Sequence, residues 1–415
     1  MLIQDRTDLE ISAPFSDTDL CVKCGLCLPH CPTYTRTLDE NESPRGRLAL
    51  IQGWAAGELL ASPKLLAHLD NCLMCRSCEA ACPAKVPYGR LLDQFRASVV
   101  PPSRPLGMKL KSGFLRKVLE HPRLQRLAAR SLRTWARRSG ALKLVGLAEL
   151  EAGLPEPAAP HPPWYGSHPA SGSETARVGL FLGCTAELAD SETVSAAIRL
   201  LNRLGVTVVV PESQGCCGAL ALHAGKREKA GSQMQDTLTA FGDRALDAIL
   251  TIASGCGATI KEYGQGGEPK SAALAPNVAD ISQYLHRLDW PEQVLFRPLD
   301  ETVWLHTPCS LKNVLRAEAH PVALLRRIPG LEVRELPATT NCCGGAGSYM
   351  LEHPQMAKRL RDDLIGPVLA GEPEMLVTSN VGCALHLRSG LRTSGRASIR
   401  VLHPVVLLEQ QTANT

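Results

Sequence analysis

The chain has 415 residues, enough for two to four domains with hydrophobic cores of their own. Apolar residues make up 44%, charged residues 21%, and the net charge is +4, which excludes a disordered or fibrous protein. The first twelve residues carry acids and no apolar core region, and no run of about 18 apolar residues occurs, so we expect a cytoplasmic protein without a secretory signal or membrane span. Sixteen cysteines in such a chain favour metal or redox chemistry over structural disulfides.

The first eight cysteines form two copies of one motif, C-x-x-C-x-x-C-x-x-x-C-P, displaced by 51 residues. In bacterial ferredoxins with this motif, three cysteines bind one 4Fe–4S cluster and the fourth binds the other cluster. Two zinc sites are the alternative, but zinc sites usually present two well separated C-x-x-C pairs. The motif therefore predicts two 4Fe–4S clusters, bound by Cys21, Cys24, Cys27 and Cys82, and by Cys72, Cys75, Cys78 and Cys31.

The other eight cysteines form a second repeat at offsets of 125 to 127 residues. Each set has a single cysteine, a Cys-Cys-Gly triplet and a final cysteine. Adjacent cysteines suggest a special cluster, a redox disulfide or a metal site, whereas buried small apolar side chains are the alternative interpretation. Thiols at helix N-termini would favour the thiolate that binds metal. The candidate metal ligands are Cys184, Cys216, Cys217 and Cys256 in one half and Cys309, Cys342, Cys343 and Cys383 in the other.

Hydrophobic periodicity predicts alternating strands and helices after residue 176, with each strand before a cysteine-bearing turn. The expected strands are 178–182, 206–210, 248–252, 303–305 and 375–377, with a helix at 194–204 and a helix-then-strand order over 322–336. The N-terminal part lacks such strands and is expected to be helical at 45–56 and 63–69. The expected fold is multidomain α+β: an α-helical two-cluster ferredoxin domain (1–97), a basic helical segment with a Pro-rich linker (98–175), and two pseudo-repeated α/β domains (176–298 and 299–415).

The segment 104–143 holds twelve Lys or Arg residues, one acid and an apolar stripe. A basic amphipathic helix pair could lie on the inner face of the cell membrane near the quinone pool. Packing on its own protein or on an acidic subunit is the alternative. No motif that binds in the grooves of nucleic acid occurs beside these basic residues, so we expect no nucleic-acid binding.

The two Cys-Cys-Gly sets resemble the cysteine-rich (CCG) domains of heterodisulfide reductases. Combined with the two-cluster motif, they resemble the iron–sulfur subunits of bacterial glycolate oxidases. The shared motifs are Cys-Pro-Thr-Tyr at 31–34, Pro-Arg-Gly-Arg at 44–47, Ala-Ser-Gly-Cys-Gly-Ala at 253–258 and the segment 380–383. This resemblance implies a complex in which a FAD-containing subunit oxidises glycolate or D-lactate. This chain, without catalytic residues, would then pass electrons toward quinone.

One departure concerns the end of each CCG half. Heterodisulfide reductases end these domains in C-x-x-C, whereas this chain has Thr259 and His386 at the last position. A noncubane cluster is therefore not expected; a conventional cluster, a zinc ion or an empty fold remain open, and His386 could complete a site. A thiol–disulfide enzyme, a zinc-stapled scaffold, and the equivalent subunit of a glycerol-3-phosphate or lactate-utilisation system are the alternative functions.

The sequence has no G-x-G-x-x-G motif following a strand, so we expect the flavin to lie on a partner subunit.

Overall fold

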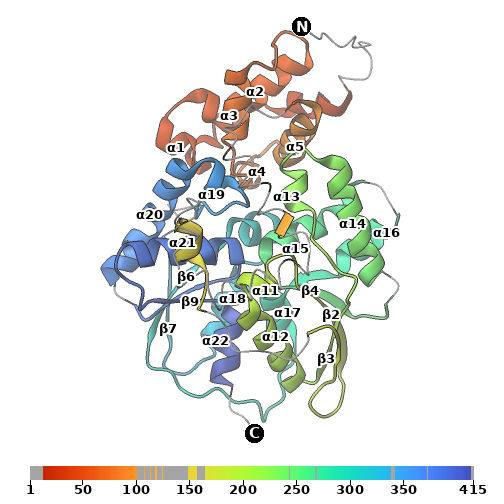
Figure 1. Cartoon of the computed structure of the whole chain (residues 1–415), viewed down its shortest axis with the longest axis vertical. Coiled ribbons are helices and arrows are strands. Elements are labelled where there is room, and N and C mark those ends of the chain that lie inside the picture. The colour runs from red at the N-terminus through yellow and green to blue at the C-terminus, as the bar shows by residue number, and fades with distance from the viewer. Residues whose placement is uncertain are drawn as a thin grey trace.

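The computed structural model describes residues 13–100, 148–156, 164–242, 244–266, 269–337, 342–371 and 373–412, with isolated positions between 107 and 124 (Figure 1). It shows the expected combination of a helical N-terminal part and two mixed α/β halves. The basic helices predicted within 104–143 lie outside the described residues except for those isolated positions, so their membrane contact stays a prediction. Within the part described, no helix is both long enough and apolar enough to cross a bilayer.

The N-terminal part is built from short helices around an aromatic core. Ser43 begins one helix by accepting the N–H of Gly46 at 2.9 Å, and Ser62 begins the next by accepting the N–H of Leu65. Trp54 packs edge-to-face on Phe95 at the centre. The elements are η1 (Ala13–Leu20), η2 (Leu28–His30), α1 (Tyr34–Thr37), η3 (Glu40–Glu42), α2 (Pro44–Ala55), α3 (Pro63–Asp70), α4 (Ser77–Ala80) and α5 (Tyr88–Ser98).

The first CCG half contains a five-stranded sheet in the order β1-β3-β2-β4-β5. All neighbours are parallel except β1, which pairs antiparallel with β3. Its strands are β1 (Gly166–His168), β2 (Ala176–Phe181), β3 (Val206–Val210), β4 (Ala248–Thr251) and β5 (Val278–Asp280). Its helices are α11 (Ala186–Ala189), α12 (Ser191–Arg203), α13 (Ala219–Leu222), α14 (Arg227–Phe241), α15 (Ser254–Lys261), η5 (Tyr263–Gly266), α16 (Pro269–Leu274), η6 (Ala275–Asn277) and α17 (Ile281–Arg287).

The second half repeats this topology in a parallel sheet with the order β7-β6-β8-β9. β6, β7, β8 and β9 therefore occupy the places of β2, β3, β4 and β5. Its strands are β6 (Thr302–His306), β7 (Glu332–Glu335), β8 (Met375–Thr378) and β9 (Arg400–Leu402). Its helical elements are η7 (Leu311–Leu315, a π-helix), α18 (Ala319–Leu325), α19 (Tyr349–Glu352), α20 (Pro354–Gly371), α21 (Val381–Thr393) and α22 (Pro404–Gln411), and α10 (Ala148–Gly153) packs on α21.

The two halves share one hydrophobic core. α22 of the second half packs against α12 of the first half, and α17 of the first half packs against α18 of the second. Buried residues of both sheets, such as Val178 and Val303, belong to the same apolar cluster. Figure 1 shows the N-terminal helices at one end of the molecule, above the two sheets, and the described C-terminal residues at the opposite end. The cysteine-bearing turns of both halves therefore lie on the side that faces the N-terminal part.

Candidate metal centres

The two ferredoxin motifs have the same unusual backbone. Residues on both sides of the second cysteine are left-handed in each copy: Lys23 and Gly25 in the first, Met74 and Arg76 in the second. Alternating right- and left-handed residues direct backbone N–H groups into a concavity, an arrangement common at anion and iron–sulfur sites. Both loops are therefore shaped to surround a negatively charged group.

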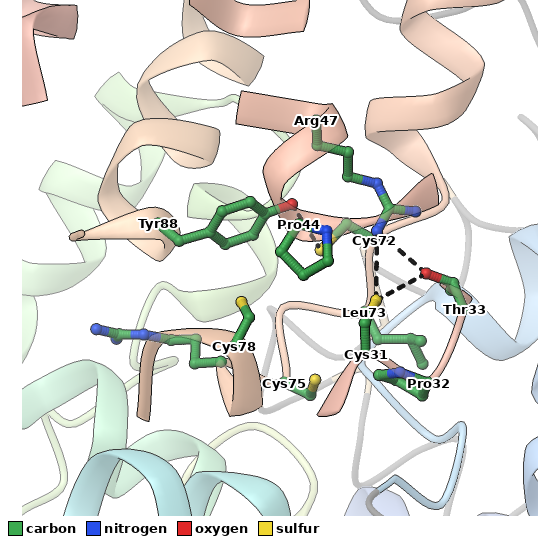
Figure 2. A pocket seen from close by; sticks show the side chains of 11 residues that line it. Cys31, Pro32, Thr33, Pro44, Arg47, Cys72, Leu73, Cys75, Cys78 and Tyr88 are labelled. Atoms are coloured by element: carbon green, nitrogen blue, oxygen red, sulfur yellow. Dashed lines mark hydrogen bonds between the residues drawn. The ribbon is translucent and has the colours of Figure 1, made fainter. Parts of the chain in front are cut away.

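One cavity brings together four of the predicted ligands. Cys31, from the first motif, lines the same space as Cys72, Cys75 and Cys78, from the second. The cavity is partly open to solvent, and Figure 2 shows the four sulfur atoms around it. Four thiols around one cavity are the ligand set that a 4Fe–4S cluster needs.

Two polar side chains, which sequence reasoning missed, border this cavity (Figure 2). The guanidinium of Arg47 is 1% exposed, donates to the carboxylate of Glu42 at 2.5 Å and lies 4.0 Å from the sulfur of Cys31. The hydroxyl of Tyr88 donates to the sulfur of Cys72 at 3.5 Å, and burial raises the pKa of this phenol well above its ordinary value. Arg47 places positive charge, and Tyr88 a polar hydrogen, beside predicted cluster ligands; groups in such positions tune the reduction potential of a cluster.

The other predicted ligand set lies nearer the surface. Cys21, Cys27 and Cys82 pack against the edge of the N-terminal core, while Cys24 is exposed. Burial raises the pKa of Cys27, and the charges of Cys21 and Cys24 raise it further. The adjacent apolar side chain of Val22 is 73% exposed. This set is therefore accessible from outside the protein, unlike the set around Cys31.

In the first CCG half the candidate cysteines gather at the carboxyl ends of the strands. Cys184 follows β2, Cys216 and Cys217 follow β3, and Cys256 lies in the first turn of α15 after β4. Hydrogen bonds from the thiols of Cys184 and Cys217 lower the pKa of Cys216. The thiol of Cys217 is also in hydrogen-bond contact with that of Cys256, so the four sulfurs form a continuous chain.

The second half repeats this chain of thiols. Cys309 follows β6, Cys342 and Cys343 follow β7, and Cys383 lies in the first turn of α21 after β8. The sulfurs of Cys343 and Cys383 are 2.8 Å apart. A hydrogen bond with the thiol of Cys342, together with burial, raises the pKa of Cys309 well above its ordinary value.

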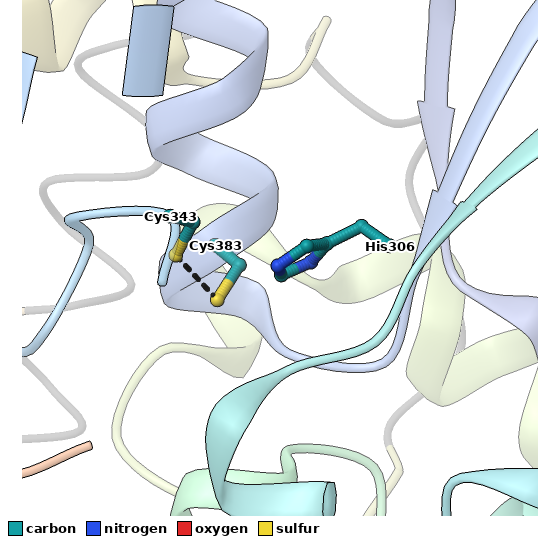
Figure 3. Close-up of side chains that lie close together, drawn as sticks. All are labelled: His306, Cys343 and Cys383. Carbon is teal, nitrogen blue, oxygen red and sulfur yellow. Dashed lines mark hydrogen bonds between the residues drawn. The ribbon is translucent and has the colours of Figure 1, made fainter. Parts of the chain in front are cut away.

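A histidine that sequence reasoning missed completes this second cluster (Figure 3). His306, the last residue of β6, is buried, and one of its ring nitrogens lies within 4.8 Å of the sulfurs of Cys343 and Cys383. Its Nδ1 is 2.8 Å from the hydroxyl of Thr378, and burial lowers its pKa to about 4. Aligning the two repeats could have drawn attention to it, because β2 has Phe181 at this position.

His386, which the sequence analysis named as a residue that could complete a site, bonds the backbone instead. The Nε2 of His386 donates to the carbonyl of Ala357 at 3.1 Å. At the matching position of the first half, the hydroxyl of Thr259 donates to the carbonyl of Gly255 at 3.1 Å. Both side chains are therefore engaged with backbone, and it is His306, not His386, that lies beside the thiols.

The buried ferredoxin set adjoins the second CCG half. Cys75 and Cys342 belong to one buried apolar cluster, together with Leu73 and Tyr349. The amide of Asn313 donates to the carbonyl of Cys75 at 2.8 Å. The N-terminal part is thus held directly over the cysteines of the second half.

Two known families match the segments that contain these cysteines. Residues 17–86 match the family described as 4Fe-4S dicluster domain, and residues 178–261 and 303–388 match the family described as Cysteine-rich domain. The glycolate oxidase iron-sulfur subunit of Escherichia coli (strain K12) is 34% identical over 92% of each chain. The probable glycolate oxidase iron-sulfur subunit of Bacillus subtilis (strain 168) is 32% identical, over 94% of this chain and 92% of its own length.

A shorter relative, the lactate utilization protein A of Geobacillus kaustophilus, is 31% identical over 55% of this chain and 96% of its own length. The dicluster domain and the cysteine-rich domains identify an iron–sulfur protein of the oxidoreductases. Since the two long matches cover nearly the whole chain, the chain belongs to the family of glycolate oxidase iron–sulfur subunits.

Proposed function

We propose that this chain relays electrons from a FAD-containing dehydrogenase subunit toward the quinone pool, while the flavin oxidises glycolate or D-lactate. The observation that carries the proposal is the position of the two ferredoxin ligand sets, one at the surface and one buried below it. When bound, the two 4Fe–4S clusters supply one-electron centres. The relatives named as glycolate oxidase subunits support the choice of a hydroxy acid.

The proposed ligand sets follow because the fourth cysteine of each motif binds the cluster held by the other motif. Cys21, Cys24, Cys27 and Cys82 would hold the outer cluster, and Cys72, Cys75, Cys78 and Cys31 the inner one. Because each motif contributes a ligand to the other cluster, the two centres are held at a fixed short separation. Residues 1–97 would form this relay, residues 98–175 would link it to the CCG halves, and residues 176–298 and 299–415 would form those halves.

The surface near Cys24 is where we expect a redox partner to approach. Val22 and Leu26, on either side of Cys24, are 73% and 57% exposed. Exposed apolar side chains beside a cluster let a partner exclude water and shorten the distance to the cluster. Arg47 and Tyr88, in contrast, stabilise negative charge at the inner site.

The test uses the assembled complex with its flavin subunit, kept free of oxygen. Glycolate, D-lactate or glycerol 3-phosphate is added in separate samples, and the reduced clusters are followed by EPR. We expect glycolate or D-lactate to reduce the clusters in the complex and to leave the isolated chain oxidised. Flavin reduction without cluster reduction would contradict the relay, and reduction by glycerol 3-phosphate alone would assign a different substrate.

A matched pair of variants locates the relay. Cys24→Ser, at the outer set, should abolish quinone reduction while flavin reduction by the hydroxy acid continues. Cys256→Ser, in the first CCG half, should leave both steps in place. Disulfide reduction by the chain with a chemical electron donor is not expected, because Thr259 and His386 stand where heterodisulfide reductases have a further cysteine.

A further inference from the structure

We propose that the second CCG half binds a single four-coordinate metal ion of the Zn²⁺ class through His306, Cys343, Cys383 and a thiolate from Cys309 or Cys342. The first three donor atoms all lie within 4.8 Å of one another. In a tetrahedral zinc site with bonds of about 2.0 to 2.3 Å, the donor atoms are about 3.5 to 4 Å apart. Only small side-chain movements are therefore needed to bring these donor atoms to the spacing of a zinc-bound site.

The compactness of this group favours one ion over a cluster. In a 4Fe–4S cluster each thiolate binds a different iron, which spreads the thiolates around the cluster. The four inner ferredoxin cysteines have that arrangement, since they stand around one cavity (Figure 2). The sulfurs of Cys343 and Cys383, in contrast, are only 2.8 Å apart. These donors converge on one point.

The orientation of the imidazole also fits a ligand. Nδ1 of His306 is held at 2.8 Å by the hydroxyl of Thr378, which leaves Nε2 available. Histidines that bind metal usually have their second nitrogen fixed by such a hydrogen bond. Figure 3 shows the ring directed at the two sulfurs, and all three residues are buried. Zinc sites with three cysteines and one histidine are common structural sites.

The first half offers a natural comparison because it cannot form the same site. Phe181 pairs with Thr251 in the first sheet as His306 pairs with Thr378 in the second. The first half thus has thiols around a phenyl ring, and the second has thiols around an imidazole. The two repeats have the same cysteines, but only the second has an imidazole nitrogen that could complete a site of mixed sulfur and nitrogen ligands.

The ion would connect three elements of the second half: the end of β6, the loop with the adjacent cysteines and the start of α21. Zn²⁺ has no redox chemistry, so this ion would fix the surface on which the inner ferredoxin site rests, without accepting electrons. The proposal does not depend on the substrate or direction of the electron relay.

The direct test is X-ray absorption at the zinc edge of the full-length chain, purified without oxygen or chelator, with zinc, iron and sulfide measured on the same sample. We expect about one zinc per chain, with three sulfur neighbours and one nitrogen neighbour. Absence of zinc, an all-sulfur shell, or iron and sulfide clearly above the content of two 4Fe–4S clusters would overturn the proposal.

Two variants assign the nitrogen ligand. His306→Phe, which copies Phe181 of the first half, should remove the nitrogen neighbour and speed zinc loss to a chelator by about tenfold or more. His386→Gln, the matched control, should keep both the nitrogen neighbour and the wild-type rate. Unchanged zinc in His306→Phe, or loss of the nitrogen neighbour in His386→Gln, would refute His306 as a ligand. If His306→Phe does not fold, the wild-type spectrum alone still distinguishes a shell of three sulfurs and one nitrogen from an all-sulfur shell.

Discussion

Tyr88 and Arg47 both reach the inner ferredoxin cysteines, but they differ in what else they support. Arg47 belongs to a buried charged network, in which Glu42 also accepts from Asn71 at 2.7 Å. Removing Arg47 would leave the Glu42 charge buried without its main partner, which typically costs about 3–5 kcal/mol. The hydroxyl of Tyr88 bonds only the sulfur of Cys72 among the hydrogen bonds of the described residues. Tyr88 is therefore the better place to test hydrogen bonding to the cluster.

Tyr88→Phe should lower the reduction potential of the inner cluster. A hydrogen bond to cluster sulfur stabilises the more negative, reduced state, and a bond of about 1 kcal/mol corresponds to about 40 mV for one electron. Redox titration monitored by EPR measures the change. Tyr349→Phe is the control, because its hydroxyl donates to Asn71 at 2.6 Å and not to a cysteine. Equal shifts in both variants would mean that the Tyr88 hydroxyl has no specific effect.

His403→Asn should make the stability of the protein less dependent on pH. Burial lowers the pKa of His403 to about 3, whereas an unfolded histidine titrates near pH 6.5. As pH falls from about 6.5 toward about 3, the unfolded chain binds a proton that the folded chain does not, so the folded state loses stability. Between pH 7.5 and 5.5 this loss is about 1 kcal/mol.

Asparagine can replace the capping function of His403, whose Nδ1 accepts the N–H of Val405 at 3.0 Å, without titrating. Thermal unfolding at the two pH values compares the variant with the wild type. A variant that loses as much stability as the wild type would show that His403 does not contribute to the pH dependence.

At the scale of elements, the loops with adjacent cysteines repeat in sequence and in packing partner, but they differ in how closely they pack. Gly344 and Gly218, which follow the cysteine pairs, both have positive φ. A Cβ on Gly344 would lie 2.5 Å from the carbonyl oxygen of Ala357, whereas a Cβ on Gly218 would lie 3.2 Å from that of Ala230. The second loop is therefore held more tightly against its neighbouring helix.

Gly218→Ala should cost about 1–2 kcal/mol, because alanine is strained in the left-handed region. Gly344→Ala should cost more, since the loop must also move away from Ala357. Thermal unfolding and metal content of both variants measure the difference. A smaller effect at Gly344 than at Gly218 would contradict the packing described for the second loop.

Much of this architecture could be predicted from local patterns. The expected strand 206–210 is observed as β3, and the helix expected at 45–56 is observed as α2 (Pro44–Ala55). The strands β1, β5 and β9 were missed because three residues at a sheet edge show too little periodicity. His306 and Arg47 were missed because the cysteines beside them lie more than ten residues away in the chain, and only the fold brings them together.

At the scale of the whole molecule, the shared core makes the two CCG halves interdependent. Leu408 of α22 is fully buried in the cluster that contains residues of both sheets. In addition, Glu409 accepts hydrogen bonds from Arg199 of α12 at 2.9 Å and 3.0 Å. The C-terminal helix of the second half is thus part of the packing of the first.

Leu408→Ala should destabilise the protein by about 2–5 kcal/mol and increase hydrogen exchange in α12 and β3 of the first half. Leu391→Ala is the matched control, because Leu391 is also buried but lies in a cluster made only of second-half residues. Hydrogen exchange measured by mass spectrometry should show its effect mainly in the second half. If Leu408→Ala left exchange in the first half unchanged, the two halves would be energetically separate.

Helices α17 and α22, each of which packs against the other half, also indicate how such a duplicated chain can arise. A single half would expose the face that the helix of the other half covers, and two identical copies could cover these faces mutually through a two-fold axis. A symmetric dimer is therefore a suitable ancestor, since duplication of its gene and fusion of the two copies keep every contact. Once fused, each copy can change alone, which is how one can carry a phenylalanine and the other a histidine at the same place in the sheet.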